Sequence, residues 1–129
     1  PQVVSNPQSY RVKATEIEEG VVFQKDDLTI EAFTALHGDI KPAFSYKITT
    51  NDKSIVISGD TSYNEALIEK AKGVDILIHE VISMTALAGL SEFWQQYHNA
   101  AHTTTEQLLR EVTKDYGGNV ILGRDLQVF

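Results

Sequence analysis

Acidic and histidine side chains follow two apolar segments near the middle of the sequence, where they could bind a metal ion or transfer a proton. Asp60 follows residues 54–58 across a single glycine. His79 and Glu80 come directly after residues 74–78. Both segments are short and rich in Ile and Val, which is typical of buried strands. Carboxylate and imidazole groups serve as ligands of divalent cations. The same groups also transfer protons in general acid–base catalysis.

A helix is predicted between these two strands. It spans residues 62–72, because Ser62 and Glu65 form the S-x-x-E pattern of a capping box. A strand, a helix and a strand in this order predict a unit whose two strands are parallel. Parallel strands end at the same edge of a sheet, and α/β proteins bind ligands at that edge. We therefore expect Asp60 and Glu80 to lie close together.

A third residue suited to catalysis, His102, stands at the predicted start of another helix. Thr103 and Glu106 form a second capping box, which places His102 just outside that helix. A catalytic role for His102 is favoured over an ordinary surface position. It is also favoured over a zinc-binding pair made by His98 and His102 at i, i+4 spacing.

The remaining candidate residues also have ordinary structural interpretations. His37 ends a predicted strand and is interpreted as a turn residue, and His79 as a structural histidine beside a buried strand. Arg124 could bind a substrate phosphate, and a surface salt bridge explains it equally well. Taken alone, Asp60 could be a loop residue that caps a helix, and Glu80 an exposed carboxylate.

The composition limits the classes of protein and of site. The 129 residues suffice for one core, and we expect a single α/β domain at residues 10–129 after an extended arm at residues 1–9. Because the chain has no cysteine, a metal would have to be held by His, Asp or Glu. The net charge of -7 disfavours nucleic-acid binding. No apolar segment is long enough to span a membrane, so we expect a cytoplasmic protein.

Alternating and helical patterns predict the other elements. One or two helices are expected over residues 81–101, and Phe93, Trp94 and Tyr97 recur there at helical spacing, so we expect these aromatic residues in the core. A further amphipathic helix is expected over residues 103–116. The predicted additional strands cover residues 10–17, 21–24, 28–36, 44–48 and 120–122.

Four short motifs lie at the ends of predicted elements. They are SGDT at 58–61, HE at 79–80, AHTTTEQ at 101–107 and GRD at 123–125. In this order they resemble motifs of the metallo-β-lactamase fold superfamily, most closely its ribonuclease Z and arylsulfatase-like branch. The resemblance extends from about Val12 to Leu126. It implies an α/β fold that is the C-terminal half of an αββα sandwich, with a mixed sheet and helices packed on one face.

The resemblance also implies a hydrolase with two divalent metal ions, usually zinc. In that family the Asp of the GDT motif bridges the two ions, and this role falls on Asp60. The His that starts the H-T-T helix faces the scissile phosphate, and this role falls on His102. Glu80 corresponds to the acid that orients this histidine.

The sequence departs from the family pattern in two places. The H-x-H-x-D-H motif that supplies most metal ligands is absent from this sequence. The terminal His ligand is replaced at Arg124 or at its neighbour Asp125, and Asp125 is the one that could ligate, through oxygen. With Asp60 as the only strong ligand, we expect this chain alone to bind metal weakly or not at all.

Two functions follow as hypotheses. In the first, the chain is part of a metal-dependent hydrolase that acts on a small-molecule phosphodiester or related ester. This chain alone is then expected to be inactive. The alternative is a non-catalytic α/β association module that has lost the metal site, and a role in RNA processing is weaker because of the acidic charge. Either way, half of a sandwich exposes one apolar face. We therefore expect a second copy or another chain, such as the missing N-terminal half, to cover that face.

Overall fold

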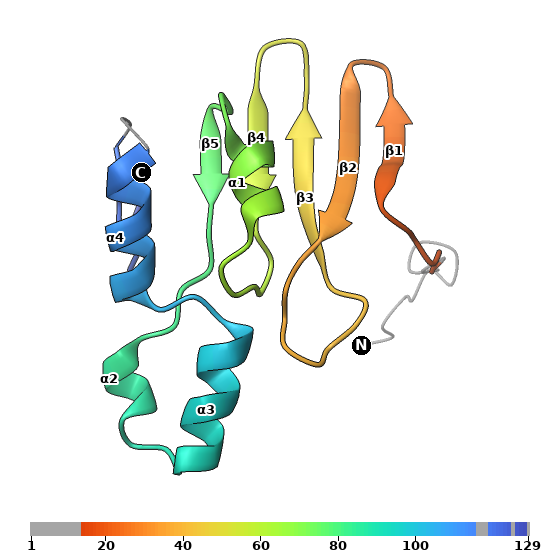
Figure 1. Ribbon diagram of the computed structural model, residues 1–129. Coiled ribbons are helices and arrows are strands. Elements are labelled where there is room, and N and C mark those ends of the chain that lie inside the picture. Colours follow the sequence, from red (N-terminus) through yellow and green to blue (C-terminus); the bar gives the residue numbers. More distant parts are fainter. Residues whose placement is uncertain (1–13, 116–118, 125, 129) are drawn as a thin grey trace, which may run out of the picture.

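The computed structural model describes residues 14–115, 119–124 and 126–128 and contains a five-stranded sheet and four helices (Figure 1). The strands are β1 (Gly20–Lys25), β2 (Leu28–Thr34), β3 (Phe44–Thr49), β4 (Ser54–Ile57) and β5 (Ile76–Ile78). The helices are α1 (Glu65–Ala71), α2 (Met84–Leu87), α3 (Glu92–Ala101) and α4 (Thr105–Asp115). None of the helices in this described part is long and apolar enough to cross a membrane.

The strands lie in the sheet in chain order, from β1 to β5. The first three neighbouring pairs are antiparallel, and β4 pairs with β5 in parallel. The predicted strand–helix–strand unit is therefore confirmed, with α1 as its connecting helix. Because two hairpins separate β2 from β4, the strands β2, β4 and β5 all run in the same direction.

Helix α1 covers one face of the sheet. Its Leu67 packs with Phe33 of β2 and Val56 of β4, and all three side chains are at most 5% exposed. Burying a side chain of this size stabilises the fold by roughly 1.5–3 kcal/mol. Val74 and Leu77 close the edge of this cluster. Helices α2 and α3 lie beyond the carboxyl ends of β4 and β5 instead of over the sheet (Figure 1).

The opposite face of the sheet is apolar. Side chains alternate along a strand, so the neighbours of Val56 and Leu77 point away from α1. On β5 these neighbours, Ile76 and Ile78, are 47% and 53% exposed. They are paired in register with Ile55 and Ile57 of β4. The described elements therefore leave an apolar stripe on this face, as expected for one sheet of a sandwich.

Two predicted strands differ in the structure. Residues 10–13 lie outside the described residues, and residues 14–17 form no strand. Residues 119–124 are irregular, so the strand predicted at 120–122 is wrong; Ile121 there is 59% exposed. A short apolar segment needs a partner strand to satisfy its backbone groups, and no described strand pairs with this one.

The predicted start of α1 is also corrected. Asn64, not Ser62, is its N-cap, and the Asn64 side chain accepts a hydrogen bond from the Ala66 amide at 3.0 Å. Asn64 also donates to the Thr34 carbonyl at 2.9 Å, so the same residue anchors α1 to β2. Ser62 binds the Leu36 carbonyl instead.

The start of α4 shifts by one residue. Thr104 and Gln107 form the reciprocal capping pair, in place of Thr103 and Glu106. The Thr104 amide donates to Gln107 Oε1 at 3.0 Å, and the Gln107 amide donates to Thr104 Oγ1 at 3.2 Å. This shift leaves Thr103 available to contact other parts of the chain.

The aromatic residues of α3 are not in the core, contrary to the expectation. Phe93 is 68% exposed and Trp94 is 49% exposed, while Tyr97 is partly buried. Helix α3 packs against α2 beyond the sheet, so the sheet does not cover these rings. The rings contact one another edge to face, which removes part of their surface from water.

A carboxylate joins the start of β5 to β4. Asp75 Oδ2 accepts hydrogen bonds from the Ser54 amide at 2.8 Å and from the Ser54 hydroxyl at 2.9 Å, and Lys53 Nζ lies 3.4 Å from Oδ1. The Ser54 hydroxyl, the Ser54 amide and Lys53 lower the pKa of Asp75 below its ordinary value. A lowered pKa in the folded state contributes stability above the ordinary carboxyl pKa, and this stability is lost as the pH falls through the lowered value.

We therefore predict that Asp75→Asn lowers the free energy of unfolding at neutral pH and flattens its decline in acid. Urea unfolding measured across the acidic range checks this prediction. Asp39→Asn, at an exposed carboxylate outside this contact, is the control. An acid decline in Asp75→Asn as steep as in the wild type would contradict it.

Candidate functional site

Three loops leave the sheet at the same edge. Because β2, β4 and β5 run in one direction, the segments that follow them begin side by side. These segments carry His37, Asp60 and Glu80. His102 reaches the same place from the junction between α3 and α4. The predicted proximity of Asp60 and Glu80 follows from this topology, and His37 is an addition that the sequence analysis interpreted as a turn residue.

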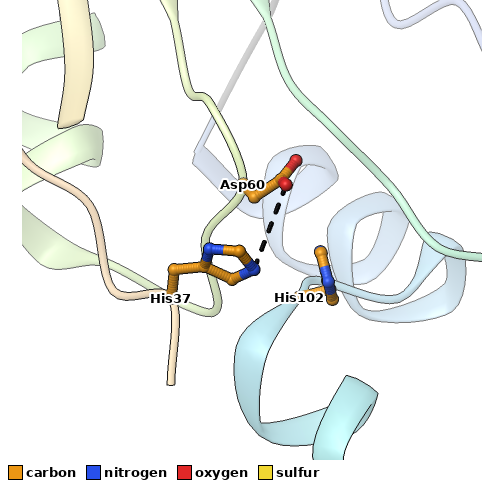
Figure 2. A group of neighbouring side chains, drawn as sticks. All are labelled: His37, Asp60 and His102. Atoms are coloured by element: carbon orange, nitrogen blue, oxygen red, sulfur yellow. Dashed lines mark ion pairs between the residues drawn. The ribbon is translucent and has the colours of Figure 1, made fainter. Parts of the chain in front are cut away.

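His37, Asp60 and His102 form a compact group of possible metal ligands (Figure 2). One donor atom from each residue lies within 4.8 Å of the other two. His37 Nε2 is 3.9 Å from Asp60 Oδ2, and the two imidazole rings meet edge to face with centroids 5.0 Å apart. Two nitrogens and one carboxylate oxygen form a donor set that suits zinc and similar divalent cations.

The members of this group differ in exposure. The side chains of His37 and His102 are 14% and 13% exposed, whereas that of Asp60 is 59% exposed. The imidazoles are therefore mostly covered by the protein, and the carboxylate is mostly open to solvent.

Glu80 holds the loops of the site together. Its Oε1 accepts hydrogen bonds from the Thr61 amide at 3.3 Å and from the Thr103 amide at 3.1 Å. The same oxygen lies 3.4 Å from His102 Nδ1. A carboxylate at Nδ1 orients an imidazole and favours the tautomer whose Nε2 is free to bind a ligand. This contact suits the orienting role that the resemblance implies for Glu80, and that role stays a prediction.

The loop that carries Asp60 has little freedom. Gly59 has a φ of +60°, and a Cβ at this position would lie 2.8 Å from the Phe44 carbonyl oxygen, so only glycine fits. Thr103 Oγ1 donates to the Thr61 carbonyl at 2.9 Å in a buried contact. These constraints fix the backbone on both sides of Asp60.

His98 and His102 do not form a shared metal site in the described structure. His102 is the C-cap of α3, and its amide donates to the His98 carbonyl at 2.9 Å. The two rings are 5.5 Å apart, but His98 Nδ1 is buried without a hydrogen-bond partner and is not part of the donor group.

The other sequence candidates lie elsewhere. His79 lines a cavity of about 410 Å³ between α1 and α4, together with Leu67 and Leu108. Asp125 lies outside the described residues, so its expected role as a metal ligand stays a prediction. The Arg124 amide donates to the side-chain oxygen of Gln127 at 3.1 Å.

A cleft of about 490 Å³ opens beside the donor group. His37 and Ser62 line it, together with Ala100 of α3. Lys41 is the cationic side chain in its lining, and it stands on the same loop as His37. The cleft therefore combines an imidazole from the donor group with a positive charge that could attract an anionic ligand.

Comparison with known proteins places these features in a family. Residues 1–121 match the beta-lactamase superfamily domain. A ribonuclease Z from Mycolicibacterium gilvum is 27% identical over 113 residues, which cover 86% of this chain and 39% of that protein. A ribonuclease Z from Mycobacterium avium is 24% identical over 111 residues, covering 86% of this chain and 40% of that protein. A ribonuclease Z from Mycobacterium tuberculosis is 30% identical over 71 residues, which cover 55% of this chain and 26% of that protein. The chain thus spans at most about two-fifths of the length of these relatives.

Removing the Glu80 carboxylate should destabilise the fold. We predict that Glu80→Ala lowers the free energy of unfolding by roughly 1.5–3 kcal/mol, because two amides lose a charged acceptor. Glu80→Gln keeps an acceptor oxygen and should lose less. Chemical denaturation measures both changes.

Glu69→Ala is the control for this comparison, because Glu69 forms an exposed ion pair with Lys72. Such pairs contribute at most about 1 kcal/mol. A Glu80→Ala protein as stable as the Glu69→Ala protein would show that Glu80 does not hold the loops together.

Proposed function

Because the chain belongs to the metallo-β-lactamase superfamily, we propose that it is part of a metal-dependent hydrolase of phosphodiester or related ester bonds. The convergence of Asp60 with the Glu80–His102 pair at one sheet edge is the observation that carries this proposal. The ribonuclease Z relatives are hydrolases by name and support the same class of reaction.

Asp60 would be a ligand of the metal ion. Its carboxylate is exposed and carries no described hydrogen bond that would have to break before an ion binds. A divalent ion bound here would lower the pKa of water and stabilise negative charge on an ester oxygen. Two ions, usually zinc in this superfamily, are our proposal for the complete site, with Asp125 as a possible oxygen ligand.

His102 would act on the substrate side. Glu80 holds its Nδ1, so Nε2 is free to face a substrate oxygen. A protonated Nε2 can give its proton to the oxygen of the leaving group as the ester bond breaks. Before this transfer, the nearby carboxylate of Glu80 balances the positive charge on the protonated imidazole, and the ring is neutral afterwards.

The cleft beside His37 suits an anionic ester. Lys41 in its lining could bind a phosphate or sulfate oxygen by its charge. The overall charge of -7 favours a small ester over a long polyanion such as RNA. We therefore propose a small-molecule substrate.

The chain should be inactive by itself. Its sequence lacks the H-x-H-x-D-H motif that the superfamily uses for most metal ligands. In this proposal another polypeptide segment, or another chain, supplies the missing ligands and covers the apolar stripe of β4 and β5. The same stripe also favours a second candidate function, an association module without catalysis.

The hydrolase proposal predicts metal-dependent turnover of bis(4-nitrophenyl) phosphate by an extended protein. In that protein, the N-terminal half of a ribonuclease Z relative, which supplies the H-x-H-x-D-H motif, is fused ahead of this chain. His102→Gln should then lower kcat about 10²- to 10⁴-fold, because the leaving group loses its proton donor. Glu69→Gln, at an exposed carboxylate of α1 outside the site, should leave turnover unchanged. Absence of turnover with zinc or manganese in the extended protein would favour the association module.

The exposed stripe predicts association of the chain in solution. We expect light scattering at micromolar concentration to give a mass above that of one 14.3 kDa chain. Ile78→Lys, which places a charge on the most exposed isoleucine of the stripe, should return the mass to that of a monomer. Thr29→Lys, on a strand remote from β5, is the control. A monomeric wild-type chain would contradict this prediction.

A further inference from the structure

We infer that His37 is a metal ligand that shares one divalent ion with Asp60, while His102 remains free for the substrate. This inference rests on the metal side of the proposed function. Neither the GDT motif nor the H-T-T motif contains His37, and its position in the sequence is typical of a turn. The structure brings it to the carboxylate of Asp60 (Figure 2).

The distance between the two donor atoms suits a shared ion. His37 Nε2 and Asp60 Oδ2 are 3.9 Å apart. This separation is too long for a hydrogen bond, which requires about 2.7–3.2 Å. It is shorter than twice a zinc–ligand distance of about 2.0–2.2 Å, so one ion can contact both atoms without any backbone movement.

The backbone fixes this separation. The Leu36 amide donates to Thr61 Oγ1 at 3.0 Å. In return, the Leu36 carbonyl accepts from the Ser62 amide at 2.8 Å and from the Ser62 hydroxyl at 3.0 Å. These three hydrogen bonds join the residue before His37 to the two residues after Asp60. The two ligands are therefore pre-organised, which lowers the entropic cost of binding an ion.

The conformation of the His37 loop supports this role. The loop turns at Gly38, which has a φ of +55°, and the Ile40 amide donates to the His37 carbonyl at 3.0 Å. A Cβ at Gly38 would lie 3.5 Å from Ala101 Cβ, so the loop packs directly against the end of α3. With the loop packed in this way, the His37 side chain is 14% exposed.

His102 has a different partner. Its Nδ1 faces Glu80 Oε1 at 3.4 Å, and Glu80 is itself held by two amides. His37 has no carboxylate partner other than Asp60 among the described ion pairs. We therefore assign His37 to the ion and His102 to the substrate, although all three donor atoms lie within 4.8 Å of one another.

Zinc titration followed by NMR of the imidazole nitrogens tests this assignment on the chain as it is. The chain contains four histidines, so the titration follows four imidazole rings. We expect zinc to shift the Nε2 signal of His37 strongly, to leave His79 unchanged and to shift His102 less than His37. The same titration gives an affinity even when binding is weak.

Variants provide the controls. His37→Gln and Asp60→Asn should each weaken zinc binding about 10- to 100-fold, at least the loss seen when groups outside the first ligand shell are removed. His102→Gln should weaken it less than about threefold, and His79→Gln should not change it. An unshifted His37 signal, or unchanged affinity in His37→Gln, would overturn the inference.

A loss in His102→Gln as large as that in His37→Gln would overturn the division of roles. These readouts do not depend on turnover. Zinc binding through His37 in an extended protein without phosphodiesterase activity would therefore refute the proposed hydrolysis and leave the ligand assignment intact.

Discussion

The site depends on one carboxylate that three segments share. Glu80 Oε1 accepts from the amides of Thr61 and Thr103 and lies beside His102 Nδ1. Each segment comes from a different part of the chain: the loop after β4, the junction of α3 with α4, and the end of β5. Without this acceptor two part-buried amides would lose a charged partner, which costs roughly 1.5–3 kcal/mol in all. The position of the imidazole is therefore coupled to the stability of the fold.

The central part of this arrangement can be predicted from the sequence, because it depends on local patterns. Two Ile- and Val-rich segments separated by a helix determine that β4 and β5 are parallel, and hence that Asp60 and Glu80 share an edge. His37 could have been found by the same logic, since two hairpins between β2 and β4 restore the strand direction. Its distance from Asp60 could not, because that distance is set by hydrogen bonds of Leu36 with Thr61 and Ser62.

Other features could not be predicted because they depend on competition between neighbouring groups. Ser62 and Asn64 are both good helix caps, and Asn64 prevails because it also reaches the Thr34 carbonyl. The pattern of Phe93 and Trp94 marks an apolar helix face but does not say whether another element covers it, and here α3 lies beyond the sheet. The strand expected at 120–122 has the right composition but lacks a partner, which a local pattern cannot reveal.

The distribution of exposure connects the fold to the chemistry. The described chain itself covers most of the imidazoles of His37 and His102, whereas Asp60 is mostly exposed. An isolated carboxylate in water gains little from a weak ion contact, because solvent competes for the same oxygen. An ion between His37 and Asp60 would be partly shielded by the buried imidazole, and a second element over this edge would exclude the remaining water. Metal affinity should therefore be higher when another element covers this edge of the sheet than when the edge is open to water. Assembly of the fold and binding of the ion are coupled in this way.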